Sequence, residues 1–191
     1  MRFFLFIVGF SLLSACQTEK TSEENTSTPP STETASSKVS TIDVQAMMDA
    51  LGLAGIEMRT SMAEVLEKAS QKIERGSVEN GEGLFDVYKV LNEQGAELAN
   101  LYYVEGEDGT EILFDIEITS DQIATPEGIR VGDPLSKLRD VYDNIKITGS
   151  EIEGWTHAQV GKVAFRLDAY NPNPEQVSVQ ESDKVLHITI R

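Results

Sequence analysis

The composition of the chain changes sharply near residue 40, and this change limits where a folded core can form. Residues 17–40 consist almost entirely of Ser, Thr, Glu, Gln, Asn, Lys, Pro and Ala, with no aromatic residue and only Val39 as a larger aliphatic one. Such a segment cannot bury enough apolar surface to offset its ordering entropy, so we expect a disordered tether. Residues 41–191 have the length of one domain with its own core.

The N-terminal segment has the layout of a secretory signal. Arg2 is followed by a mostly apolar run from Phe3 to Leu13 and then by small residues. This order matches the charged, apolar and cleavage regions of a signal peptide, and the run is too short to span a bilayer stably. We therefore predict that residues 1–15 are a signal peptide that is removed from the mature protein.

The end of this segment also points to lipid attachment. The cleavage region reads Leu13-Ser14-Ala15-Cys16. It resembles the bacterial lipobox, in which an aliphatic residue and two small residues precede an obligatory cysteine. The resemblance implies that the thiol of Cys16 receives a diacylglyceryl group, that the chain is cut before Cys16, and that the new amine is acylated, for example with palmitate. The alternative is an ordinary signal peptide followed by a chance cysteine.

The cysteine and charge counts add to this prediction. Cys16 is the only cysteine in the sequence, so no disulfide can form within the chain, and lipidation would consume a thiol that is a liability in an oxidising compartment. The formal net charge is −16. Because such an acidic chain is repelled by nucleic acid, we expect the membrane as a partner through Cys16, and no nucleic acid.

The residues that follow Cys16 bear on its location. By resemblance to enterobacterial sorting signals, Gln17 in place of Asp after the cysteine implies the outer membrane. We expect a lipid-anchored protein on the periplasmic face of that membrane. Glu19, Glu23 and Glu24 leave display on the cell surface open as the alternative.

Hydrophobic periodicity gives a coarse map of the folded part. Apolar residues at helical spacing predict helices at Ile42–Leu53, Ser61–Ile73 and Pro134–Val141. We expect Thr60 or Ser61 to cap the second helix and Asp133 to cap the third. Alternating segments between turn residues predict strands. These strands are Leu84–Leu91, Glu97–Val104, Glu111–Thr119, Ile145–Thr148, Trp155–Val160, Val163–Ala169, Gln176–Val179 and Lys184–Ile190.

Two pairs of these segments match each other at nearly the same separation. A Gly-Ile-x-apolar pattern followed by a helical stretch occurs at Gly55–Leu66 and again at Gly128–Arg139. The alternating strand Ile112–Ile118 is matched by Lys184–Ile190. We therefore predict an α+β fold: two tandem helix-plus-antiparallel-meander units, at about 42–120 and 121–191, packed as one domain. Coincidence is the alternative.

One segment carries a further resemblance. Residues 128–142 read Gly-Ile-Arg-Val-Gly-Asp-Pro-Leu-Ser-Lys-Leu-Arg-Asp-Val-Tyr. This resembles a segment of small secreted and lipid-anchored bacterial proteins in which a turn starts a helix. With the tandem layout, it is similar to β-lactamase-inhibitory-protein-like domains and to the small lipoprotein of the outer-membrane β-barrel assembly machinery. Those units favour Gly-Met-Thr before the helix, which this chain lacks. The resemblance implies a binding or scaffolding module without catalysis.

Few side chains suggest a catalytic or metal-binding pattern. His157 and His187 each fall at an outward position of an expected strand, and no Cys or His-x-x-x-His spacing accompanies them. We expect surface histidines, with a metal pair or a general base as the alternative. The sequence also lacks a Gly-x-Ser-x-Gly nucleophile elbow.

An acidic turn is expected between two of the strands. Its four carboxylates could hold calcium, but Asp and Glu with Gly also suit an ordinary hairpin turn. These residues are Glu105, Glu107, Asp108 and Glu111. We therefore predict no metal site and no cofactor.

The aromatic residues could form either a core or a binding face. Core packing is the more common role of such residues on alternating strands. Tyr102 and Tyr103 are adjacent, so in a strand they point to opposite faces. The other candidates are Trp155, Tyr142, Tyr170, Phe114 and Phe165. The turn-rich loop Asn171-Pro172-Asn173-Pro174 is expected to be a connection, with a contact surface as the alternative.

These observations favour a lipid-anchored envelope lipoprotein whose domain binds or scaffolds a partner without catalysis. An enzyme or enzyme accessory that acts on cell-envelope polymers is the alternative, and a purely structural lipoprotein is a third possibility. A cleft with converging carboxylates would favour the enzyme. An exposed apolar patch rimmed by polar residues would favour the binding module.

Overall fold

The computed structural model describes residues 38–80 and 83–191. The expected signal peptide at 1–15, Cys16 and most of the expected tether at 17–40 lie outside the described residues. At the end of that tether, Val39 is half-buried and forms a parallel bridge with Tyr142. No helix in the described part is long and apolar enough to cross a membrane.

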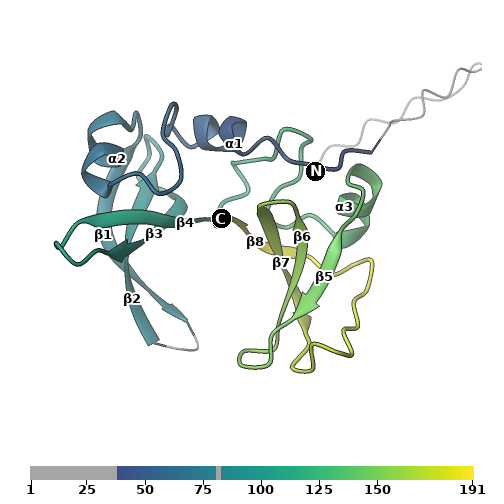
Figure 1. The fold of residues 1–191 in the computed structure, drawn as a ribbon. Coiled ribbons are helices and arrows are strands. Elements are labelled where there is room, and N and C mark those ends of the chain that lie inside the picture. Colours follow the sequence, from purple (N-terminus) through teal and green to yellow (C-terminus); the bar gives the residue numbers. More distant parts are fainter. Residues whose placement is uncertain (1–37, 81–82) are drawn as a thin grey trace, which may run out of the picture. The chain divides into compact units, whose positions relative to one another are not determined.

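Three helices of seven residues each and eight strands of four to nine residues make up the described elements (Figure 1). The helices are α1 (Val44–Ala50), α2 (Met62–Lys68) and α3 (Leu135–Val141). The strands are β1 (Lys72–Asn80), β2 (Gly83–Leu91), β3 (Glu97–Glu105), β4 (Glu111–Ile118), β5 (Lys146–Gly149), β6 (Trp155–Val160), β7 (Val163–Tyr170) and β8 (Val185–Ile190).

All of these strands lie in one eight-stranded antiparallel sheet within the described residues, in the order β1-β2-β3-β4-β8-β7-β6-β5. Two runs of consecutive strands therefore meet where β4 pairs with β8. We call this junction the β4–β8 seam. It contains three residue pairs, Ile116–Ile190, Glu117–Thr189 and Ile118–Ile188, whereas β1 and β2 share nine. The seam brings together residues about seventy positions apart in the sequence.

All three described helices pack on the same face of the sheet. Alternation along β4 sends Ile116 and Ile118 into a core, because successive side chains of a strand point to opposite faces. That core also contains Met47 and Met48 of α1. Its other members from the helices and central strands include Met62, Val65, Leu135, Leu138, Tyr142, Leu101, Phe165 and Ile188.

The predicted α+β fold class is wrong. Two tandem helix-plus-meander units need helices that form substantial layers, whereas the described structure is one continuous sheet with three seven-residue helices beside it. Part of the predicted second helix, Ser61–Ile73, is strand: α2 ends at Lys68, and Lys72 begins β1. Ile73 pairs with Val90 in the β1–β2 ladder, so strand pairing overrides its helical spacing. The division into two repeats stays a prediction.

The other element predictions have mixed outcomes. The strand Trp155–Val160 is confirmed with its bounds, and the Ser61 cap is confirmed because Ser61 Oγ accepts a hydrogen bond from Glu64 N at 3.3 Å. No strand forms at Gln176–Val179. The Asp133 cap is wrong by one residue: Pro134 is the N-cap of α3 and makes no side-chain cap bond.

The segments that lead into α2 and α3 make matching backbone contacts with the sheet. Before α2, Arg59 N donates to Leu113 O (3.1 Å), and Leu113 N donates to Thr60 O (2.9 Å). Before α3, Gly132 N donates to Val185 O (2.8 Å), and Val185 N donates to the carbonyl of Asp133 (2.9 Å). We call these two segments the first and second junctions. Arg59 has φ 76° and Gly132 has φ 90°, so both lie in the left-handed region.

Candidate functional site

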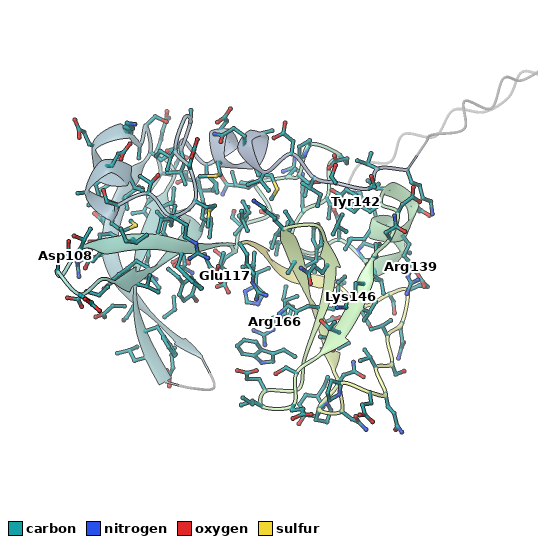
Figure 2. All side chains as sticks on the ribbon, in the orientation of Figure 1. Asp108, Glu117, Arg139, Tyr142, Lys146 and Arg166 are labelled. Carbon is teal, nitrogen blue, oxygen red and sulfur yellow. The ribbon has the colours of Figure 1, made fainter. Side chains whose placement is uncertain are left out.

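The face of the sheet opposite the helices carries polar and charged side chains. We call it the open face. Its central row contains His187 of β8, Arg166 of β7 and His157 of β6, which are register partners across the three strands. Glu117 of β4 also points to the open face, because its strand neighbours Ile116 and Ile118 are buried in the core. It lies beside this row because β4 pairs with β8. Figure 2 shows Glu117 and Arg166 on this side of the sheet.

A cleft of about 390 Å³ opens on this face. It crosses the β4–β8 seam, so both runs of strands contribute to its walls. The lining residues are Val78, Glu79, Tyr102, Asp115, Glu117, Ser150, Glu153, Trp155, His157, Arg166, His187, Thr189 and Arg191. We call it the open-face cleft.

Four side chains in the cleft form a connected group, which we call the Arg166 cluster. His187 Nδ1 lies 3.0 Å from Glu117 Oε2, and His187 Nε2 lies 3.1 Å from Arg166 Nη1. The guanidinium of Arg166 covers the ring of Trp155, with Cζ 3.7 Å from the ring centroid. This is the geometry of a cation–π contact.

The contacts of His187 define its tautomer. Because the guanidinium of Arg166 can only donate, His187 Nε2 accepts, and the ring proton lies on Nδ1, which donates to Glu117. Both ring nitrogens of His187 are then occupied. A general base needs a free ring nitrogen near its substrate, so this arrangement suits a positioning residue for Arg166.

Two buried side-chain polar atoms in the described residues lack a hydrogen-bond partner, Arg166 Nε and Asn100 Oδ1. Asn100 pairs with Glu117 in the β3–β4 ladder, so both atoms belong to the open face. Burial lowers the pKa of Arg166, which still remains charged at neutral pH. A buried group without a partner costs about 1–3 kcal/mol. An unpartnered group of this kind calls for an explanation, such as a functional role or a bound water or ion.

A second group of charges lies next to the Arg166 cluster. A bulge around Phe114 allows Leu113 to stay in the core while Asp115 reaches the open face. Asp115 Oδ2 is 3.8 Å from Arg191 Nε. Burial raises the pKa of Asp115, although the positive charges of Arg191 and Arg59 oppose this effect.

Tyr102 and His157 are uncharged at neutral pH. Burial, together with the charge and a hydrogen bond of Glu117, raises the pKa of Tyr102 to about 12, so the hydroxyl stays protonated. Burial lowers the pKa of His157 to about 4, and the positive charges of Arg191 and Arg166 act in the same direction. The cleft therefore holds these two side chains as neutral donors or acceptors.

Both sequence-predicted histidines face outward, as expected. They are not freely exposed, because His157 is half-buried and the side chain of His187 is only 17% accessible. The structure brings them together on the open face, where His157 of β6 and His187 of β8 lie on either side of β7. No group of three potential metal ligands forms among the described residues.

The acidic turn forms a hairpin tip away from the open-face cleft (Figure 2). Asp108 Oδ1 accepts a hydrogen bond from Thr110 N at 3.0 Å, and this bond lowers the pKa of Asp108. Glu111 pairs with Arg75 and accepts from the Tyr88 hydroxyl at 2.5 Å. The other two carboxylates, Glu105 and Glu107, are exposed.

The aromatic residues divide between core, cleft and surface. Tyr142 and Phe165 are in the core. Trp155 and Tyr102 line the open-face cleft. Tyr103 points away from Tyr102 and packs edge-on against Tyr88, with ring centroids 5.5 Å apart. Tyr170 and Phe114 are the exposed members of the set, at 74% and 40%.

The Asn171 loop is a connection tied to the core. Asn171 is 5% exposed, and its side chain bonds Thr156 Oγ1 at 2.7 Å and the backbone of Ser178 on both sides. These bonds make the loop part of the scaffold behind the cleft.

Sequence reasoning missed the charged residues of the site. No local motif marks these residues: Arg166, Glu117 and Asp115 are single polar positions in their strands, and Arg191 directly follows β8. The available signal was a run of charged and aromatic residues on the outward face of neighbouring strands. That signal becomes specific only after β4 is known to pair with β8.

Comparisons with known proteins add little. No family model matches the sequence, and no curated protein matches it. Among solved structures, the chain is similar to the crystal structure of the uncharacterized protein yfeY from Escherichia coli. The two share 15% sequence identity with a TM-score of 0.46, over 81% of this chain and 99% of that chain. A likeness this distant carries no argument about function.

Proposed function

We propose that this protein is a lipid-anchored component of the bacterial envelope whose domain binds a partner, without catalysis, in the open-face cleft. The anchor is Cys16, and the location is the outer membrane. The sequence of residues 1–17 supports the anchor and the location.

One observation carries the binding role. Helices cover one face of the sheet, whereas the open face has a cleft in which charged and aromatic side chains are fixed by contacts with each other. Preformed concave sites with a few oriented polar groups are typical of binding sites. The orphaned atoms of Arg166 and Asn100 on the same face fit this interpretation.

The binding role can be tested by site-specific photo-crosslinking in cells. A photoreactive amino acid at Glu79, on the cleft wall, should yield a reproducible adduct. The matched control is the same amino acid at Glu67, which is exposed on α2 at the helix-covered face. Adducts of equal yield at both positions, or none at Glu79, would contradict the proposal.

The anchor can be tested separately. Cys16→Ser removes the thiol that a thioether-linked lipid requires, so radiolabelled palmitate incorporation should disappear and the precursor should remain uncut. Ser22→Thr is the control, because it lies outside the Leu13–Cys16 motif and leaves Cys16 in place. If Cys16→Ser protein matures and stays with the membrane fraction, the lipobox interpretation fails.

A second candidate function rests on Asp115. Its raised pKa and its place beside Glu117 in the cleft are features of an acid catalyst for polymer hydrolysis. The contacts of both groups oppose this role, because Asp115 faces Arg191 and Glu117 accepts from His187. Release of soluble fragments from purified envelope polymers, lost in Asp115→Asn, would favour the enzyme over the binding module.

A further inference from the structure

The guanidinium of Arg166 has no carboxylate within ion-pair distance in the described part of the chain, although the charges of Glu117 and Glu153 act on it. It donates to His187 Nε2 and forms no ion pair of its own among the described residues. Other arginines of the described chain do form ion pairs, including Arg75, Arg139 and Arg191. We propose that the open-face cleft recognises a carboxylate group of its ligand, with Arg166 as the anchor; this inference rests on the proposed binding function.

The atoms of Arg166 show where such a ligand would bind. The face of the guanidinium is held against Trp155, Nη1 is held by His187, and Nε is buried. Nη2 has no hydrogen-bond partner in the described part of the chain, and it is not among the buried polar atoms there. This nitrogen and the second hydrogen of Nη1 therefore form the accessible edge of a fixed planar fork. That edge matches the two oxygens of a carboxylate.

An anion in this part of the cleft would meet two cations, Arg166 and Arg191, although four carboxylates, Glu79, Asp115, Glu117 and Glu153, also line the cleft. At His157, beside Arg166, the cations Arg191 and Arg166 outweigh Glu153 in their effect on the pKa of the ring. Arg191 is also a second accessible cation, since its side chain is 54% exposed and its contact with Asp115 is long at 3.8 Å.

The same cleft disfavours a doubly charged ligand. Glu117 and Glu153 are close enough to raise the pKa of Arg166, so their negative charges also act on a ligand at that position. Repulsion grows with the charge of the ligand, which favours a monoanionic carboxylate over a phosphate. Trp155 and Tyr102 flank the site and can contact the apolar part of the ligand.

Trp155 provides the measurement, because it is the single tryptophan in the sequence and lies directly against Arg166. The experiment titrates the full-length protein in detergent with two carboxylates and follows tryptophan fluorescence. N-acetyl-dialanine represents a peptide C-terminus, and glucuronic acid represents an acidic sugar. Each has a neutral counterpart, N-acetyl-dialanine amide and glucose. Inorganic phosphate is the control for general anion binding.

We expect a saturable change in tryptophan fluorescence with at least one carboxylate and not with its neutral counterpart. The compound that responds shows whether the ligand carboxylate belongs to a peptide C-terminus or to an acidic sugar. Arg166→Met should weaken carboxylate binding at least about tenfold. The affinity of Arg166→Lys should lie between those of Arg166→Met and the unaltered protein, because lysine keeps the charge but lacks the planar guanidinium. Arg139→Met, on the exposed surface of α3, should bind like the unaltered protein. Circular dichroism reports whether each variant is folded.

Three results would overturn the proposal. They are equal responses to a carboxylate and its neutral counterpart, phosphate binding as tight as carboxylate binding, and no carboxylate response below about 10 mM. If a partner still crosslinks at Glu79 in that case, the binding function stands and only the carboxylate specificity is lost.

Discussion

The two junctions place a helix on the sheet with the same backbone bonds but different side chains. Arg59 and Thr60 bond Leu113 at the first junction, and Gly132 and Asp133 bond Val185 at the second. The N-cap of the helix is Ser61 at the first junction, with a side-chain bond, and Pro134 at the second, without one. Pairing with the strand therefore determines the backbone path, whereas the residues that tolerate this path can vary.

The residue at positive φ shows the difference most clearly. Gly132 adopts φ 90° without steric cost, because glycine has no Cβ. Arg59 adopts φ 76° at a cost of about 1 kcal/mol. Its guanidinium lies 4.0 Å from the centroid of the Phe114 ring, and this contact offsets part of the cost.

The largest expected effect is at the second junction. Gly132→Val places a β-branched residue at φ 90°, and no side chain nearby can compensate, so the free energy of unfolding should fall by about 2 kcal/mol. Urea denaturation followed by circular dichroism measures the change. An unaltered midpoint would show that the second junction does not need its left-handed residue.

Removal of the serine cap should have an intermediate effect. Ser61→Ala removes the acceptor for Glu64 N and should lower the free energy of unfolding by about 1 kcal/mol. The matched control is Pro134→Ala, which removes no cap bond and should cost only about 0.5 kcal/mol, because it gives the unfolded chain more conformational freedom. If the two substitutions cost the same in urea denaturation, the junctions do not differ in capping.

Substitutions at Arg59 should separate two contributions to the free energy of unfolding: the cost of its positive φ and the gain from its contact with the Phe114 ring. Arg59→Ala keeps the positive φ and loses the contact with Phe114, so it should destabilise by about 0.5 kcal/mol. Arg59→Gly loses the contact but also removes the strain, so it should be close to neutral. Thermal unfolding of both variants is the measurement, and a glycine variant less stable than the alanine variant would refute this account.

The smallest expected effect is a pH dependence from Asp133. Although burial favours its protonated form, hydrogen bonds from Lys137 and the backbone of Arg130 hold the pKa of Asp133 below its usual range. A lowered folded-state pKa stabilises the protein above the unfolded-state pKa, and this stability is lost as the pH falls through the folded-state value. Asp133→Asn should therefore lose less stability than the unaltered chain between about pH 5 and pH 3 in urea denaturation. Thr60→Ala, at the matching position of the first junction, should leave that slope unchanged.

The fold was predictable where local patterns act alone. Trp155–Val160 alternates strictly between inward and outward positions, so its strand was recognised with its bounds. The edge strand β1 was missed because Lys72, Glu74 and Ser77 are exposed and polar, so the strand lacks a hydrophobic alternation. The second helix, α2, was predicted too long because helical spacing does not show where the pairing of β1 begins.

The site was predictable only in part. The outward position of His187 follows from alternation along β8, but its contact with Glu117 depends on the β4–β8 pairing. That pairing joins distant parts of the sequence, and no local signal specifies it. Arg166 has the same limitation, since its role arises from Trp155 on one neighbouring strand and His187 on the other.

The narrow β4–β8 seam has a consequence for how binding can be detected. Three residue pairs hold two longer meanders together, so opening at this position needs fewer broken bonds than opening elsewhere in the described sheet. A ligand held by residues from both sides of the seam stabilises only the closed form, by mass action. The amide hydrogens of Ile116, Ile118 and Ile190 should then exchange more slowly with solvent as ligand is added. Their exchange rates would therefore report how much of the open-face cleft is occupied by ligand.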